Sequence, residues 1–312
     1  MNSVKIIAEV GSNYDGDLNT AVQYVKTAKQ CGADIVKFQT LSKDKLVAPK
    51  VWLDGKTADN PVYQQFSNLG LPDKWHFLLK RTADEQGIEF MSTPFYLEAV
   101  DLLEKVGVHT YKIASGDITF RPLLKAVGRT GKRVILSTGG SSLHDVEQAL
   151  NILRQAGARD IVLLHCVSNY PPQWREMNLR AIVTLKDKFG LPVGISDHTP
   201  GCLVPIAAVT LGAAVIEKHV TFDRSLPGPD HPFAMTMEEF AEMIRQVRYL
   251  EEALGTGEKS PADSEQAKQH RMRRGIYHSV TFEPTDDPEG IWLRPEHPWT
   301  SPSHSYSDKM KR

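Results

Sequence analysis

The chain has 312 residues, 41% of them hydrophobic, and a formal net charge of −1 at pH 7. This length is long for an ordinary domain but usual for one α/β barrel with additions, and the composition is typical of a globular protein with a full-sized core. The near-zero net charge provides no global field toward nucleic acid or a membrane surface, so we expect neither as a partner.

We expect no targeting or membrane segment. The start, MNSVKIIAEVGSNYDGD, lacks the basic and then apolar regions of a signal peptide. The longest apolar runs, IVLL and LVPIAAV, are far shorter than the roughly 20 residues that span a bilayer. The cysteines Cys31, Cys166 and Cys202 are scattered, without a C-x-x-C pair. These features predict a cytoplasmic protein with reduced thiols.

Eight short segments rich in Val and Ile alternate with amphipathic segments along the chain. Each is nearly continuous in apolar character rather than alternating, which is the pattern of parallel strands buried on both faces. The predicted strands are Val4–Val10, Ile35–Thr40, Glu89–Phe95, Thr110–Ser115, Arg133–Gly139, Asp160–Ser168, Pro192–His198 and Val215–Phe222.

The segments between them carry helix start and stop signals. In the last one, Thr236 and Glu239 form a capping box and Gly255 supplies the stop, and 142–157 and 178–190 repeat the scheme. Eight strand–helix units in order favour a closed (β/α)8 TIM barrel, an α/β fold. An open doubly wound sheet is the alternative, but no G-x-G-x-x-G follows the first strand.

Two regions interrupt this rhythm. Residues 41–71 form a long loop after the second strand, a feature that is usually functional or mobile. After Gly255 the chain becomes polar and Pro-rich. We expect a TIM-barrel catalytic domain over 1–282 and, over 283–312, a short C-terminal extension without a core of its own.

Nearly all predicted strands end in residues that carry chemistry, and in a barrel these ends share the active-site face. Lysines and carboxylates inside apolar segments are costly to bury unless they are paired or bound to a ligand. The strand-end residues are Glu9, Asn13, Lys37, Gln39, Ser92, Thr93, Lys112, Ser115, Asp117, Ser137, His165, Ser168, Tyr170, Ser196, Asp197, His198, Glu217 and His219.

These residues sort by charge into two halves of a site. Lys37 and Lys112, with the hydroxyl groups and glycine turns around them, suit an anion that carries phosphate and carboxylate. His198 and His219 suit a divalent metal, with Glu9 and Asp230 nearby, and imidazole favours Mn, Zn, Co or Fe over Mg.

A single strand-end histidine or lysine is more often structural. We expect His165 to be such a residue. Glu217 and Lys218 alternate along the last strand, so one of them is expected to face the helices in a structural pair.

Several long motifs follow one another over about residues 4–280. They are IAEVGSNYDGD, CGADIVKFQT, STPF, YKIASGD, ILSTG, LLHCVSNYP, PVGISDHT and VIEKHVTFDRSLPGPDH, then a helix with TMEEF. Together they resemble the sialic acid synthase (N-acetylneuraminate synthase) family. The resemblance implies a TIM-barrel transferase of carbohydrate biosynthesis. It would condense phosphoenolpyruvate with an N-acetylated hexose or related aldose, giving a nonulosonic (sialic-acid-like) acid and phosphate.

The resemblance also assigns roles to residues. It implies that His198 and His219 bind a divalent metal, most often Mn²⁺, with Mg²⁺ or Co²⁺ as alternatives. Phosphoenolpyruvate would be held by Lys37, Thr93, Lys112, Ser115, Ser168 and Ser196. The sugar would contact Gln39, Asn60, Asp117, Tyr170 and Asp230. Catalysis would fall to Glu9, Lys37, Lys112 and His198, with Glu9 as an acid/base near the metal.

The sequence departs from the family pattern on the sugar side. Most full-length members continue into a small antifreeze-like domain, whose arginine reaches the acceptor site of the partner subunit, whereas this chain stops at Arg312. A homodimer is expected from the resemblance, but without that contact. Tyr14 stands where His is frequent, and Asp117 where Glu is frequent.

Two other classes of function stay open. One is a metal-dependent barrel aldolase or sugar-phosphate enzyme built on the same histidine pair, and the other is a non-catalytic binding protein that kept the fold. The lysine pair, which would face a small anionic donor, favours the synthase over the aldolase. The presence of every metal and lysine position argues against the binding protein.

Overall fold

The computed structural model describes residues 3–66 and 69–293, and the chain divides into two compact units, Met1–Leu254 and Gly255–Arg312. The sequence places the end of the catalytic domain at 282. The first unit ends instead with helix α10 (Met237–Leu254), which completes the last strand–helix repeat before Gly255 takes a positive φ of 58°.

The second unit contains the short helices α11 (Asp263–Gln266) and α12 (Gln269–Met272) and the antiparallel pair β12 (Gly275–Tyr277) and β13 (Ile291–Leu293). Tyr277, Ile291 and Leu293 form a small buried cluster. This cluster differs from the expectation of an extension without a core over 283–312. The remainder of that prediction, 294–312, lies outside the described residues.

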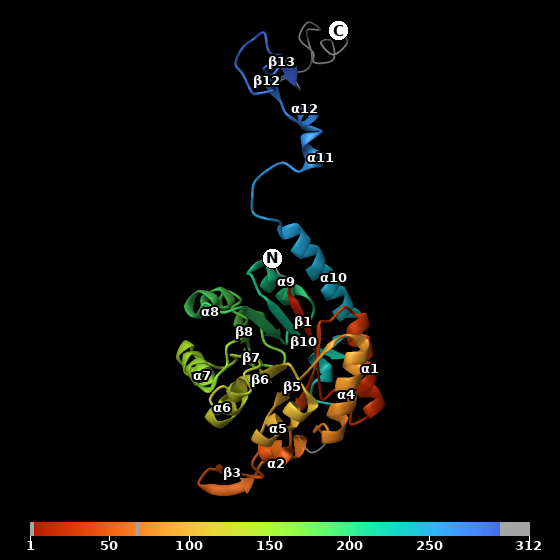
Figure 1. Ribbon diagram of the computed structural model, residues 1–312, viewed down its shortest axis with the longest axis vertical. Helices are drawn as coiled ribbons and strands as arrows, with labels where there is room; N and C mark the ends of the chain where they lie inside the picture. Colours follow the sequence, from red (N-terminus) through yellow and green to blue (C-terminus); the bar gives the residue numbers. More distant parts are fainter. Residues whose placement is uncertain (1–2, 67–68, 294–312) are drawn as a thin grey trace. The chain divides into compact units, whose positions relative to one another are not determined.

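The first unit is a closed barrel of parallel strands (Figure 1). Each strand pairs with its neighbours in chain order, and β1 pairs with β10 to close the ring, with Lys5 opposite Val215. The (β/α)8 prediction is therefore confirmed and the open sheet is excluded. The strands are β1 (Lys5–Gly11), β2 (Ile35–Thr40), β5 (Glu89–Pro94), β6 (Thr110–Ile113), β7 (Arg133–Ser137), β8 (Ile161–Cys166), β9 (Val193–Asp197) and β10 (Val215–Thr221).

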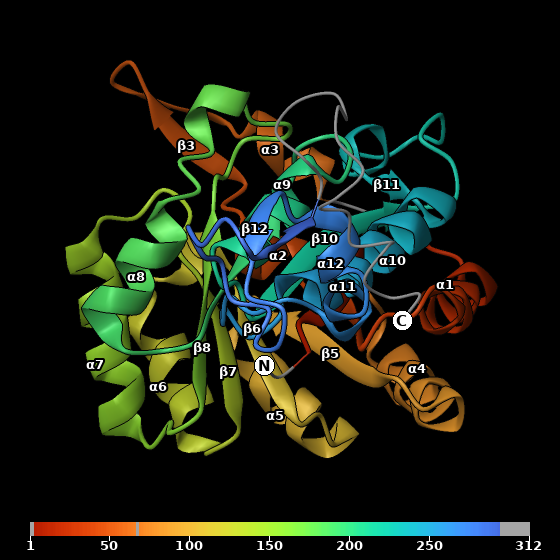
Figure 2. The same ribbon diagram turned by 90° about the horizontal axis from the view of Figure 1, so that it is seen from above.

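Helices lie outside the strands, with α6, α7 and α8 beside β7 and β8, and α1 and α4 across the barrel (Figure 2). In α10 the predicted capping box is formed, because Glu239 N donates to Thr236 Oγ1 and Thr236 N to Glu239 Oε2. Among the helices of the described residues, none has the length and hydropathy needed to cross a bilayer. The outer helices are α1 (Leu18–Gln30), α4 (Asp73–Gln86), α5 (Leu97–Val106), α6 (Arg121–Arg129), α7 (Leu143–Ala156), α8 (Ala181–Phe189), α9 (Leu203–Thr210) and α10.

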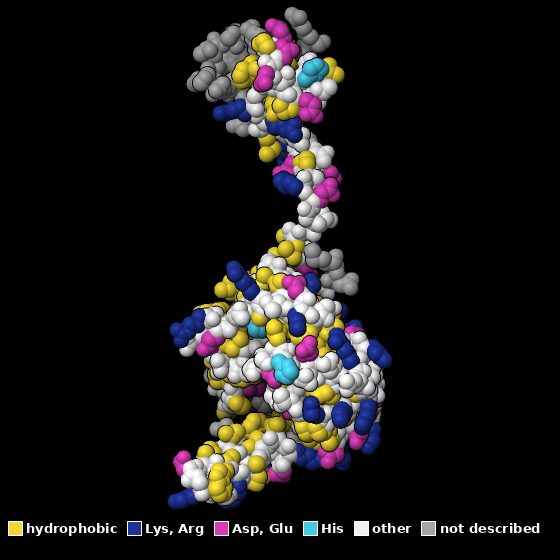
Figure 3. All heavy atoms as spheres, turned by 90° about the vertical axis from the view of Figure 1, so that its left-hand side faces the viewer, with side chains coloured by type: hydrophobic (Ala, Val, Ile, Leu, Met, Phe, Trp, Pro, Cys, Tyr) yellow, Lys and Arg dark blue, Asp and Glu magenta, His cyan; other side chains and the backbone are white. Residues whose placement is uncertain are grey.

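The connection over residues 41–71 is not a bare loop. It holds the short helices α2 (Lys43–Leu46) and α3 (Pro61–Gln65) and a hairpin of β3 (Lys50–Leu53) and β4 (Lys56–Asp59). Trp52 is 74% exposed and Leu53 52%, so the hairpin presents apolar side chains to solvent (Figure 3).

Strand side chains alternate between two cores. One face packs against the helices in the large cluster that includes Ile6, Ala8, Phe38 and Ile216. The opposite face fills the barrel interior with an apolar floor of Ile7, Ile35, Met91, Ile135, Val162, Leu164 and Val215. Residues two positions further along these strands point to the same interior, nearer the carboxyl ends. The next layer of interior side chains therefore lies between this floor and the mouth of the barrel, where the active site is expected.

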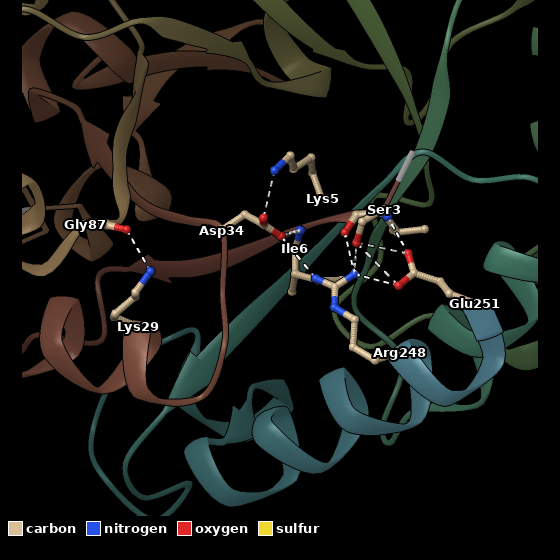
Figure 4. A network of polar contacts seen from close by, with 9 residues as sticks. Ser3, Lys5, Ile6, Lys29, Asp34, Gly87, Arg248 and Glu251 are labelled. Carbon is tan, nitrogen blue, oxygen red and sulfur yellow. Dashed lines mark hydrogen bonds and ion pairs between the residues drawn. The ribbon is translucent and has the colours of Figure 1, made fainter. Parts of the chain in front are cut away.

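A polar network fastens the end of α10 to the start of β1 (Figure 4). Arg248 donates to the carbonyl of Val4 at 2.9 Å and contacts Asp34 Oδ2 at 3.3 Å. Asp34 in turn accepts from the backbone N–H of Ile6 at 2.9 Å, so it bridges the loop before β2 to β1. Glu251 accepts from the backbone N–H of Val4. These contacts satisfy backbone groups where the barrel closes.

Gly194 on β9 tests how tightly the interior is packed. A Cβ at this position would lie 2.2 Å from the carbonyl oxygen of Val215 and 2.8 Å from Cδ2 of Leu164. We predict that Gly194→Ala lowers the free energy of unfolding by about 1–3 kcal/mol, measured by urea denaturation. Gly116→Ala, where a Cβ meets nothing within 4 Å, is the matched control. Equal stability of the two variants would contradict this packing.

Candidate active site

Two lysines and two glutamates from four strands meet above the apolar floor. Lys37 Nζ lies 2.7 Å from Glu9 Oε2 and 3.6 Å from Glu217 Oε2, and Lys112 Nζ lies 3.4 Å from Glu217 Oε1. All four side chains are buried. We call Glu9, Lys37, Lys112 and Glu217 the charged layer.

Burial and mutual attraction set the charge states of this layer. Burial alone would raise the pKa of Glu217, but the ammonium groups of Lys112 and Lys37 outweigh it and lower that pKa. Burial raises the pKa of Glu9, with Lys37 acting against it, and burial lowers the pKa of Lys112. The layer thus holds a glutamate that favours the charged form beside one that favours a proton.

Small and hydroxyl-bearing residues extend the charged layer toward the rim. Gly139 N donates to Ser115 Oγ at 2.9 Å, and a Cβ on Gly139 would lie 2.3 Å from Ser168 Oγ. Thr93 Oγ1 accepts from Lys37 Nζ at 3.3 Å, and Ser196 Oγ donates to Glu217 at 3.0 Å. All six residues predicted to hold phosphoenolpyruvate thus belong either to the charged layer, to its hydroxyl partners, or to the hydroxyl cradle around Gly139.

His198 and His219 lie side by side, with ring centroids 5.3 Å apart. Burial is the main cause that lowers the pKa of each imidazole to about 3, so both rings are neutral near pH 7. His198 Nδ1 lies 3.2 Å from the carbonyl oxygen of Val167, which places the proton on Nδ1 and leaves Nε2 with a free lone pair. Phe233 packs against both rings and Tyr170 against His198.

This pair fits a divalent metal held partly by other ligands. The Nδ1 atom of His219 is buried and has no hydrogen-bond partner among the described residues. Neutral imidazoles are the form that binds metals. Within the described residues no group of three or more His, Cys, Asp or Glu side chains is arranged around one ion. Two imidazoles would therefore leave positions for oxygen atoms of water or substrate.

Four of the five residues predicted to contact sugar border this pair or the charged layer. Gln39 donates to Glu9 Oε1 at 2.7 Å, and Asp230 Oδ2 lies 3.8 Å from His219 Nδ1. The ring of Tyr170 packs against His198 at a tilt of 47°. Burial raises the pKa of Asp117 to about 6, with Lys112 opposing, and its Oδ2 atom is buried without a partner among the described residues.

Asn60 is not brought to the site by any contact of the described residues. Its amide donates to the carbonyl of Ala48 at 2.8 Å and its Oδ1 accepts from Val62 N at 3.0 Å. The side chain therefore caps α3 within the long connection. Its role in sugar binding stays a prediction.

The side chains of Glu217 and Lys218 point to opposite faces of β10, as alternation along a strand requires. Lys218 points to the helix layer and pairs with Asp197 at 2.6 Å, which is the structural pair expected there. Glu217 points into the barrel and contacts both site lysines, a role the sequence did not assign to it. Its position two residues before His219 was the available signal, because such residues share a strand face. His165 is structural as expected, since Nε2 contacts the carbonyl of Met177 at 2.6 Å.

The fold and this site define a (β/α)8-barrel enzyme class with a buried cation–carboxylate layer and a pair of neighbouring histidines. Residues 24–259 match the model of the NeuB family. The chain belongs to the NeuB family, and the resemblance to sialic acid synthases is confirmed.

Individual relatives agree with this assignment. The chain is 43% identical over 280 residues to an N,N'-diacetyllegionaminic acid synthase of Legionella pneumophila, covering 87% of this chain and 79% of that one. An uncharacterised protein of Methanocaldococcus jannaschii is 46% identical, covering 87% and 78%. Among solved structures, the N-acetylneuraminic acid synthetase of Leptospira borgpetersenii superposes with a TM-score of 0.78 at 35% identity, covering 86% and 90%.

Glu217→Gln tests the charged layer through stability. Removing one partner leaves Lys112 with an uncompensated buried charge, which costs about 3–5 kcal/mol of unfolding free energy at pH 7. Because the pKa of Glu217 is lowered in the folded chain, its stabilisation is present above the ordinary value of 4.5 and is lost as pH falls. The difference from wild type, measured by urea denaturation, should therefore narrow below that pH.

Asp84→Asn is the matched control, because it removes one partner of the helix-surface pair with Lys80. Such pairs contribute about 0.3–0.5 kcal/mol. A Glu217→Gln effect no larger than this control would show that the charged layer adds nothing to stability.

Proposed function

We propose that this chain condenses phosphoenolpyruvate with an N-acetylated hexose or a related aldose, forming a nonulosonic acid and releasing phosphate. The observation that carries this proposal is that the lysine pair and the histidine pair converge at one end of the barrel. Glu217, which contacts Lys37 and Lys112, lies two residues before His219 on β10. The first pair suits a small polyanion and the second a metal that engages an aldehyde, so the two substrates would meet between them.

The donor would lie on the charged layer. Lys37 and Lys112 would hold the carboxylate and phosphate of phosphoenolpyruvate by charge-assisted hydrogen bonds, and Thr93, Ser115, Ser168 and Ser196 would complete the cradle. The two ammonium groups face developing negative charge on the phosphate as it leaves. Because they are held in a buried site, they stabilise that charge without reorganising.

The acceptor would lie above the donor, with its aldehyde toward the histidines and its hydroxyl and amide groups toward Gln39, Asp117, Tyr170 and Asp230. We propose Mn²⁺ at His198 and His219, with Mg²⁺ or Co²⁺ as alternatives. When bound there, such an ion supplies Lewis acidity toward the aldehyde oxygen.

The reaction balances as follows. The methylene carbon of phosphoenolpyruvate forms a bond to the aldehyde carbon, whose oxygen gains a proton. Water adds to the central carbon of the donor, and one of its protons passes to the aldehyde oxygen. The bond from that carbon to the phosphate oxygen then breaks as the added hydroxyl becomes the carbonyl, and the second proton leaves with the phosphate. Glu9 would supply or take a proton at this step, a role supported by its raised pKa and its contact with Lys37.

The test is an assay of phosphate release with Mn²⁺ and a panel of aldoses that includes N-acetylmannosamine and bacillosamine-type hexoses. We expect release to require both phosphoenolpyruvate and an aldose. Turnover of a sugar phosphate alone would favour the alternative, a metal-dependent barrel aldolase or sugar-phosphate enzyme. Release from phosphoenolpyruvate without any aldose would also contradict the proposal.

The proposed metal site at His198 and His219 is tested separately, by measuring bound Mn²⁺. His198→Ala should lose bound Mn²⁺ in an equilibrium dialysis measurement. His165→Ala, which removes a buried histidine of the neighbouring strand, is the matched control and should retain it. Equal metal content in the two variants would remove the histidine pair as the metal site.

A further inference from the structure

The segment after β10 places Asp230 at the acceptor side of the site. Asp230 Oδ2 lies 3.8 Å from His219 Nδ1 and 3.4 Å from Ser12 Oγ. Gly11 has a φ of +56°, and a Cβ there would lie 2.5 Å from the same carboxylate oxygen. Any side chain at residue 11 would therefore collide with this carboxylate, so glycine at the end of β1 makes room for it.

The next residue, His231, begins the short helix η3 (His231–Phe233) and is completely buried. Its Nε2 atom lies 3.0 Å from Asp15 Oδ1, in the loop between β1 and α1. Its Nδ1 atom lies 2.7 Å from Thr221 Oγ1, at the end of β10. One imidazole thus joins three chain segments around Asp230.

The contacts of this chain involve both ring nitrogens of His231. A carboxylate only accepts, so His231 Nε2–H donates to Asp15. The hydroxyl of Thr221 has one proton and two acceptors within reach, His231 Nδ1 at 2.7 Å and the carbonyl oxygen of Asp223 at 3.0 Å. The oxygen of that hydroxyl accepts in turn from the backbone N–H of Asp223 at 3.0 Å. Two contacts therefore define the orientation of the imidazole plane.

The backbone is shaped around this imidazole. Gly228 has a φ of +155°, and a Cβ there would lie 2.8 Å from Cδ2 of His231. Asp15 has a φ of 53° in the left-handed region. The other end of the segment is held separately, because Arg224 donates to the carbonyl of Ala234 at 2.9 Å and pairs with Glu239. The histidine thus secures the part of the segment that carries Asp230.

We propose that His231 is a positioning residue that, through Asp15 and Thr221, holds the Asp230 carboxylate beside His219 and so sets the affinity for the aldose. This inference rests on the proposed function. His231 is completely buried and the proposed function assigns it no contact with either substrate, so its influence on acceptor binding passes through Asp230. The residues proposed to hold the donor come from other strands and their loops, so the donor subsite is not affected.

Steady-state kinetics of His231→Gln and Asp15→Gly test the proposal, with the aldose that turns over fastest in the panel above. Glycine tolerates the left-handed backbone of residue 15, so Asp15→Gly removes the carboxylate without backbone strain. We expect the KM for the aldose to rise about tenfold to a hundredfold in both variants, with the KM for phosphoenolpyruvate unchanged. His165→Gln, a buried histidine outside the site, is the control and should change neither KM.

A double-mutant cycle separates positioning from a general structural role. If His231 acts through Asp230, the effects of His231→Gln and Asp230→Asn on the aldose KM are not additive. Additive effects, or an aldose KM like that of wild type in both His231→Gln and Asp15→Gly, would overturn the proposal. If His231→Gln does not fold, the same test uses the aldose KM of Asp15→Gly and the double-mutant cycle of Asp15→Gly with Asp230→Asn. Failure of the proposed function is distinguishable, because wild type itself would then release no phosphate.

Discussion

The site depends on the burial of two lysines and two glutamates inside the barrel. An ammonium or carboxylate group is costly to remove from water unless it is paired. Here the charges offset one another at 2.7–3.6 Å, on a floor of apolar side chains that admits none of them lower in the barrel. The layer therefore holds two lysines in fixed positions beside a glutamate that favours the charged form and one that favours a proton, which suits the binding of a small polyanion.

The rest of the molecule supports this layer. Closure of β10 onto β1 brings Glu217 into contact with Lys37, and the network at Arg248 secures that closure from the opposite end of the strands. Next to the layer, hydrophobic burial keeps His198 and His219 neutral and Phe233 packs against both. The same barrel interior thus holds paired charges in the charged layer and neutral imidazoles beside it, because burial outweighs the neighbouring carboxylates at His198 and His219.

Much of this arrangement could be predicted from the sequence. Continuous apolar runs located all eight strands, and the strand-end rule placed Lys37, Lys112, His198 and His219 on one rim. Glu217 was named among the strand-end residues but given no role, although its position two residues before His219 indicates that both side chains point into the barrel. Asn60 was placed by motif, whereas the actual fold of residues 41–71, a hairpin with flanking short helices, uses its amide locally. The small cluster around Tyr277 depends on pairing between segments separated by a loop, for which the sequence carries no periodic signal.

The central claim is that the ammonium groups of the charged layer hold the donor. The most direct measurement is a calorimetric titration of phosphoenolpyruvate into the protein without aldose, comparing wild type with Lys112→Met. Loss of a hydrogen bond to a charged group in this buried site predicts affinity weaker by about tenfold to a hundredfold. Binding of phosphoenolpyruvate to folded Lys112→Met with the affinity of wild type would contradict the account.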